Sequence, residues 1–232
     1  MLVRGINHWT PHAFTPTFPN RDCPPHFYAD GNNPQFPYFQ ELMEYTNRAS
    51  HLLYGGHSLS ECAVLYHGEA EWTTGEAMLY QKPLRQLAER QINGDVVDID
   101  ALTGENSRFE GETLHIHTQR YHSLILPYME FLPATLLPFL QQAKEENFPV
   151  YLVDAYPVSD TNGRALSQEL VEHLTLVPLE SLGQTIETTH GKEVKVAGDY
   201  PHLRAFGVQH SDGTVYQFFN EDTHKSCTTE VT

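Results

Sequence analysis

Two carboxylates and an indole ring follow directly after a short apolar run in the segment ECAVLYHGEAEW. The run, Cys62–Leu65, is typical of a strand that is buried on both faces. In open α/β sheets, ligands bind just beyond the carboxyl ends of the strands, where Glu69, Glu71 and Trp72 would then lie. Carboxylates accept hydrogen bonds from sugar hydroxyls, and an indole offers a flat apolar platform to a pyranose. The segment therefore predicts a carbohydrate site, with a solvated loop as the alternative.

Glu69 and Glu71 are also the candidate catalytic residues, because glycosidases work with two carboxylates. In an extended segment they would share one face, with Cα atoms about 7 Å apart. Glycosidase pairs usually come from different strands, which lets the surroundings raise the pKa of one carboxyl and spare the other. The pair alone therefore identifies no catalytic residue firmly.

A second group of candidates lies in RGINHWTPHAF, near the start of the chain. His8, Trp9 and His12 follow a short apolar run and could be site residues at the end of a strand. Together with Glu71 and Trp72 they form the predicted substrate-binding set. Local packing of a proline-rich segment is the alternative explanation.

No metal or cofactor is predicted. His115 and His117 alternate in LHIHTQRYH, so on a strand they would share a face and could chelate one metal ion. The spacing fixes no third ligand, however, and a polar strand face is the commoner outcome.

The cysteines exclude two further classes of protein. Cys23, Cys62 and Cys227 are odd in number, far apart and without CxxC spacing, which argues against a disulfide framework and a cysteine-based zinc site. Free thiols fit a reducing compartment, so we expect a cytoplasmic protein. The N-terminus lacks the pattern of a signal peptide, and no apolar run is long enough to span a membrane.

The 232 residues can bury a sizeable core, and their charge restricts the partners. Lys and Arg number 14 against 30 Asp and Glu, which gives a formal net charge of -16. Such a chain repels phosphate backbones, so neither nucleic acid nor an anionic membrane is an expected partner.

Strand and helix patterns alternate after a leader, residues 1–35, that is rich in proline and aromatic residues. Because it is too apolar to be left in water, we expect this leader to pack against the chain or a second copy. A helix is predicted over 36–54. Strands are predicted at 62–66, 95–99, 123–126, 150–153 and 176–178, and helices at 83–92, 134–147, 166–174 and 179–188. Three more strands, at 193–197, 203–210 and 214–220, follow, the last two joined by a Ser-Asp-Gly turn.

Strands that alternate with helices predict an α/β fold, here a doubly wound three-layer α/β/α sandwich with a C-terminal antiparallel β hairpin. Such a sheet is similar to that of class I glutamine amidotransferases. Their chemistry needs a nucleophile at a strand-to-helix turn, and the corresponding segment VYLVDAYP has neither cysteine nor serine there. Cys62 lies inside a strand, where a thiol is usually inert.

The order of segments resembles the region that follows the (β/α)8 barrel in family 42 β-galactosidases. RGINHWTPHAF looks like the last barrel strand, AVLYHGEAEW through VYLVDAYP like the flavodoxin-like domain, and LRAFGVQHSDGTVYQFFNE like the start of an accessory β domain. The resemblance implies three parts: 1–58 as the end of a barrel, 59–189 as the flavodoxin-like domain and 190–232 as the hairpin. A complete barrel needs about 250 residues and eight βα units, which this chain does not hold.

In that family the flavodoxin-like domain mediates trimerisation, and the catalytic glutamates belong to the barrel. The resemblance therefore implies a non-catalytic part of a glycoside hydrolase that forms a homo-oligomer and lines the site for the parent enzyme's carbohydrate substrate. Two alternatives stay open: a self-contained small hydrolase that uses Glu69 or Glu71, and a stand-alone carbohydrate-binding or interaction module.

Overall fold

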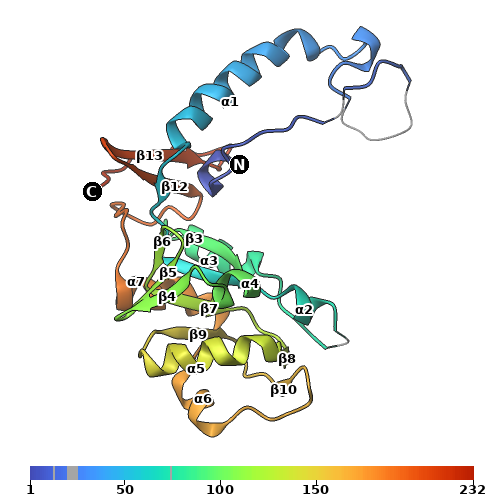
Figure 1. Cartoon of the computed structure of the whole chain (residues 1–232). Helices are drawn as coiled ribbons and strands as arrows, with labels where there is room; N and C mark the ends of the chain where they lie inside the picture. Colours follow the sequence, from blue (N-terminus) through green and yellow to red (C-terminus); the bar gives the residue numbers. More distant parts are fainter. Residues whose placement is uncertain (13, 20–25, 74) are drawn as a thin grey trace.

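A parallel five-stranded sheet forms the centre of the chain (Figure 1). The computed structural model describes residues 1–12, 14–19, 26–73 and 75–232. The sheet has the order β11-β9-β7-β2-β3, which confirms the predicted α/β class. Its strands are β2 (Cys62–Tyr66), β3 (Gly94–Asp98), β7 (Ser123–Leu126), β9 (Val150–Val153) and β11 (Thr175–Val177). β2, β7 and β9 have the predicted bounds, and β3 and β11 begin one residue earlier than predicted.

Both β2 and β7 are interior strands of this sheet, as their continuous apolar runs predicted. β2 pairs with β3 on one side and with β7 on the other, and Cys62 lies between Gly94 and Ser123. Counted along the chain, the strand order is 2-1-3-4-5 when read from β3 to β11. The connections therefore leave β2 and β7 in opposite directions, and ligand sites of open sheets are found at such a point.

The predicted helices are present, but their first and last residues differ from the predicted ones. The predicted helices at 36–54, 134–147 and 179–188 each begin with a 3-10 turn. α2 and α4 were not predicted. No helix among the described residues is long and apolar enough to cross a membrane.

The α-helices are α1 (Phe39–Leu53), α2 (Gly68–Glu71), α3 (Gln81–Ala88), α4 (Ile99–Thr103), α5 (Leu137–Glu145), α6 (Gln168–His173) and α7 (Leu182–His190). The 3-10 helices are η1 (Leu2–Arg4), η2 (Ala29–Gly31), η3 (Phe36–Tyr38), η4 (Ala134–Leu136) and η5 (Leu179–Ser181).

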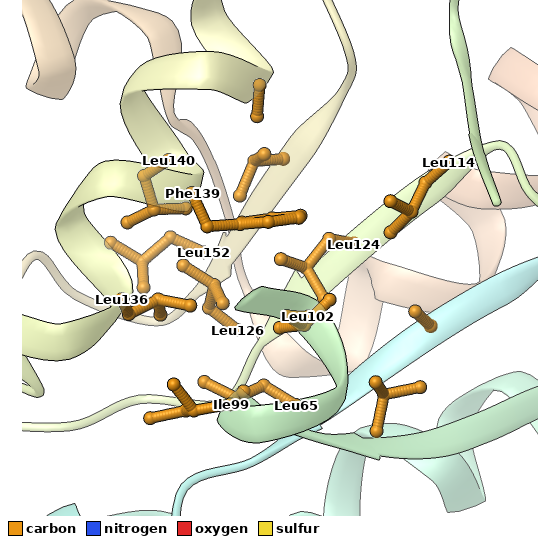
Figure 2. Packing of buried hydrophobic residues seen from close by; sticks show 14 of the residues in the cluster. Leu65, Ile99, Leu102, Leu114, Leu124, Leu126, Leu136, Phe139, Leu140 and Leu152 are labelled. Carbon is orange, nitrogen blue, oxygen red and sulfur yellow. The ribbon is translucent and has the colours of Figure 1, made fainter. Parts of the chain in front are cut away.

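Alternate side chains of the strands enter two separate hydrophobic clusters. Leu65, Leu124 and Leu152 pack with residues of α4, α5 and α6 in the larger cluster (Figure 2). Their sequence neighbours, such as Val64 and Ile125, pack with residues of α3 and α7 in the other cluster. Because successive residues of a strand point to opposite sides, the two clusters cover the two faces of the sheet.

Two antiparallel sheets and a two-stranded parallel sheet lie beside the central sheet in the chain order. The C-terminal hairpin is confirmed: β12 (Leu203–His210) pairs with β13 (Gly213–Asn220), and β1 (His57–Ser58) pairs with β12. The sheet of β4 (Ser107–Glu110), β5 (Thr113–Ile116) and β6 (Gln119–Tyr121) was not predicted. The predicted strand at 193–197 is wrong, since only an isolated bridge from Val196 to Val231 is formed there. A short parallel pair joins β8 (Phe131–Leu132) to β10 (Ser159–Asp160).

The leader packs mainly against α1 and the hairpin. Leu2 and Val3 join a small cluster with Leu53, Phe206 and Val208. Farther along, Phe14, Phe27, Phe36 and Phe39 bring their rings together at the start of α1. Figure 1 shows α1 extending away from the central sheet. Leu2 and Val3 are therefore packed within the chain, as predicted, whereas Phe14 and Phe18 are 52% and 60% exposed, so their packing against a second copy stays a prediction. Cys23, Pro24 and Pro25 lie outside the described residues.

Candidate functional site

The point between β2 and β7 is covered by the chain that connects β2 to α3. Residues 76–78 pair with residues 128–130: the Met78 amide donates to the Tyr128 carbonyl at 2.7 Å, and the Glu130 amide to the Glu76 carbonyl at 2.7 Å. The Glu76 amide also donates to the Glu130 carboxylate at 2.9 Å. These bonds tie together the two chain segments that follow β2 and β7.

His67 lies beneath this cover and is fully buried. Neither ring nitrogen has a hydrogen-bond partner of good geometry among the described residues, and one carboxylate oxygen of Glu71 is likewise buried without a partner. Burial lowers the pKa of His67, and Glu71 and the backbone of Met78 and Leu65 act in the opposite direction. The sequence around His67 does not predict that this side chain is buried, because its burial depends on the fold of residues 75–80.

We expect His67 to make the protein less stable as the pH falls through 6.5. The folded state has the lower pKa, so below 6.5 the unfolded state binds the proton first and gains free energy relative to the folded state. The loss should continue until the pH lies below the folded pKa. His67→Phe removes the titrating ring and should stabilise the protein at pH 5 relative to the wild type by on the order of 1 kcal/mol.

Urea unfolding of both proteins between pH 4.5 and 8 measures this difference, and the exposed His8→Phe variant is the control. A wild type and a His67→Phe variant with parallel pH profiles would show that His67 is not held neutral by burial.

Glu69 and Glu71 do not form the extended pair that the sequence suggested, so that prediction is wrong. Both lie in α2, where residues two positions apart do not face each other. Glu69 is exposed and Glu71 half-buried, with Trp72 next to them at 79% exposure. The segment thus presents an open indole rather than a paired acid and base. The substrate-binding roles of Glu71 and Trp72 stay predictions.

His8, Trp9 and His12 lie at the other end of the molecule, beside α1. The Trp9 indole donates a hydrogen bond to the Ser50 hydroxyl at 2.8 Å, while His8 and His12 are exposed. Figure 1 shows α2 well away from the N-terminal segment and α1. The structure therefore does not bring the two groups of predicted substrate-binding residues together within this chain.

The turn after β9 carries a carboxylate at its first residue, Asp154. Asp154 has φ 68°, a left-handed conformation that Asp tolerates better than most residues. Its carboxylate accepts from the Leu179 amide at 2.7 Å, so it serves to hold the start of η5. Cys62, the candidate thiol elsewhere, is fully buried, and burial raises its pKa to about 12. Neither residue is placed as a nucleophile.

A cavity of about 670 Å³ brings several histidines together beside β5. His115 is buried and lies 3.4 Å from the Glu110 carboxylate, and His117 occupies the tight turn between β5 and β6 with φ 52°. Because of that turn, the two rings do not belong to one strand as the sequence suggested. Among the described residues no group of three His, Cys, Asp or Glu side chains could hold a metal ion.

A cavity of about 830 Å³ was not predicted from the sequence. It lies between η1, α3, the edge strand β3 and the hairpin, and is lined by Arg4, Arg85 and Arg204. These arginines are far apart in sequence, so no local sequence pattern predicted the cavity. A hydrogen-bonded group borders it: Asp95 accepts from Ser60 at 2.7 Å and from the Tyr121 hydroxyl at 3.0 Å.

The comparisons with known proteins give a likeness of structure only. No protein-family model matches the chain, and no curated protein sequence does. A rhamnosidase from Novosphingobium sp. PP1Y is similar with a TM-score of 0.55 and 15% identity over 80% of this chain and 19% of its own. An apo exo-carrageenase GH42 from Bacteroides ovatus is similar with a TM-score of 0.46 and 11% identity over 84% of this chain and 30% of its own. The chain thus spans less than a third of either structure and shares a fold with part of the rhamnosidase.

Proposed function

We propose that this chain is a non-catalytic domain of a glycoside hydrolase, serving assembly and lining a carbohydrate site. The observation that carries the proposal is the shared fold with a rhamnosidase over 80% of this chain, which corresponds to 19% of that enzyme. The strand order supports the finer assignment to the doubly wound, flavodoxin-like class. The proposal includes domain boundaries after residues 58 and 189. It also includes a role of the domain in trimerisation.

The disposition of the carboxylates supports a non-catalytic role. A glycosidase places two carboxyl groups on either side of the scissile bond. Glu69 and Glu71 instead lie on one short helix and point in different directions, and one oxygen of Glu71 is buried. This arrangement gives no support to the self-contained hydrolase. In the proposed parent enzyme, Trp72 offers its exposed ring to a sugar, and His8, Trp9, His12 and Glu71 are the other candidate contacts.

The assembly surface that we propose is a stripe formed by Tyr38, at the end of η3, and by Leu42, Tyr45 and Leu52 of α1. All four side chains are exposed, and their spacing of four, three and seven residues places them along one side of the helix. An adjacent side of α1 packs against the chain, since Thr46, Ser50 and Leu53 are buried. Apolar stripes of this kind usually pack against a partner helix.

We expect the purified chain to self-associate through this stripe, as measured by sedimentation velocity at tens of micromolar. Tyr45→Glu should shift the distribution to the monomer, because a carboxylate buried at an apolar contact must be desolvated. Asn47→Glu adds the same charge at an exposed position two residues away and is the matched control. A wild type that stays monomeric, or association that survives Tyr45→Glu, contradicts the proposed assembly role.

A further inference from the structure

An unpaired edge of the central sheet borders the cavity of about 830 Å³. β3 is the last strand of the sheet on this side and pairs only with β2. Residues 93–96, which include the first three residues of β3, line the cavity together with one side of α3. The other walls come from η1, β12 and Glu221. Figure 1 shows β3 on the side of the central sheet that faces the hairpin.

The backbone of β3 offers hydrogen-bonding groups along this edge. Some of the N–H and C=O groups of an edge strand point away from its one neighbour and stay unpaired. Within the described part of the chain, no backbone group of residues 94–96 forms a hydrogen bond outside the pairing of β3 with β2. The groups that point away from β2 are therefore available to a further strand.

The charged side chains of the lining already have partners within the chain. These partnerships are Arg4 with Glu221, Arg204 with Glu221, Arg85 with Glu89, and Asp95 with the hydroxyls of Ser60 and Tyr121. A charged ligand would have to compete with these partners, whereas a neutral ligand leaves them intact. The lining therefore favours an uncharged ligand.

Apolar side chains beside the edge can receive the side chains of an added strand. Val96 of β3 is 47% exposed, and Leu84 of α3 is half-buried in the same lining. The five residues of β3 span about 16 Å at about 3.3 Å per residue, which is the length of a short extended segment. A row of regularly spaced amides and carbonyls matches a peptide backbone, and addition of a strand to a sheet edge is a common mode of peptide recognition.

We propose that this cavity binds an uncharged extended peptide, which adds to β3 as a sixth strand of the central sheet. Its backbone pairs with residues 94–96, and its small apolar side chains pack between Val96 and α3. This peptide partner lies outside the proposed function, and the inference does not depend on that function.

The test is an NMR titration of the isotope-labelled full chain with the peptide acetyl-Thr-Val-Thr-Val-Thr-amide, whose blocked ends leave it without charge. With the peptide in excess, the amide signals of residues 94–96 should shift. The amides among them that point away from β2 should exchange with water at least about tenfold more slowly, because pairing protects them. The same peptide N-methylated at two consecutive residues cannot pair along either of its edges. It should bind at least about tenfold more weakly, because the lost backbone bonds carry the affinity.

Two valine variants give a matched comparison. Val96→Lys should weaken peptide binding about tenfold, because a lysine on an edge strand opposes the addition of another strand. Val158→Lys alters a valine that is 69% exposed and does not line this cavity, so it should leave binding unchanged. Both positions are exposed, so neither variant opens the hydrophobic core.

Equal affinity for the N-methylated peptide would overturn the proposal, because the site would then recognise side chains alone. Absence of binding, signal shifts confined to another edge such as β13, or unchanged affinity in Val96→Lys would overturn it as well. Slow exchange of residues 94–96 that appears without peptide and increases with protein concentration would assign this edge to a second copy of the chain instead.

Discussion

Replacing Phe148 with alanine should lower the free energy of unfolding by about 4 kcal/mol, because a large aromatic side chain leaves a cavity that the core cannot fill. Phe148 is fully buried in the larger hydrophobic cluster, and its ring lies 5.3 Å from that of Phe109. Its amide donates to the Ala143 carbonyl at 2.8 Å, a backbone bond that the substitution retains. The expected loss therefore reports side-chain packing between the sheet and α5.

Urea unfolding followed by circular dichroism measures this loss. Phe219→Ala, on the hairpin at 55% exposure, removes the same atoms from a solvated position and is the control. It should change the free energy of unfolding by less than about 0.5 kcal/mol. Similar losses in the two variants would mean that Phe148 is not part of the main core.

Replacing Asp95 should separate a hydrogen-bond loss from a charge effect. Asp95→Ala leaves the buried hydroxyls of Ser60 and Tyr121 without their acceptor and should cost about 2 kcal/mol. Asp95→Asn keeps a side-chain oxygen as acceptor and removes the ionisable group. At neutral pH its free energy of unfolding should therefore be closer to that of the wild type than the free energy of unfolding of Asp95→Ala is.

The pH dependence of Asp95 runs opposite to that of His67. Burial raises the pKa of the Asp95 carboxyl above 3.8, and the bonds from Ser60 and Tyr121 act against this rise. As the pH rises above 3.8 the unfolded state loses its proton first, so stability decreases until the pH exceeds the folded pKa. The difference in free energy of unfolding between Asp95→Asn and the wild type should increase over this window. A difference that stays constant with pH, measured by urea unfolding, would contradict the raised pKa.

The central sheet was predictable because its strands are buried on both faces. Continuous apolar runs such as VYLV at 150–153 need no alternating pattern to be recognised. β4, β5 and β6 carry mixed residues such as Arg108, His115 and Arg120 on a half-exposed sheet, so their sequence resembles a polar loop. Gly111, with φ 60°, was the one local sign of the turn that joins β4 to β5.

The candidate site was less predictable than the fold for two physical reasons. Glu69 and Glu71 follow a strand, but the chain turns into α2 at once, and side-chain direction depends on that turn. The cavity of about 830 Å³ is lined by Arg4, Arg85 and Arg204, which only the tertiary fold brings together. The prediction of a strand at 193–197 was wrong. Val194 is buried, as a strand residue could be, but it lies in irregular chain and not in a β ladder.

The most direct test of the proposed non-catalytic role is turnover of aryl glycosides by the purified chain. A panel of nitrophenyl α- and β-glycosides, including the galactoside and the rhamnoside, covers the proposed class of parent enzyme. We expect no release of nitrophenol above the rate in buffer, and the same rate for wild type and Glu71→Gln. Turnover by the wild type that disappears in Glu71→Gln would contradict the account and establish the chain as a hydrolase in its own right.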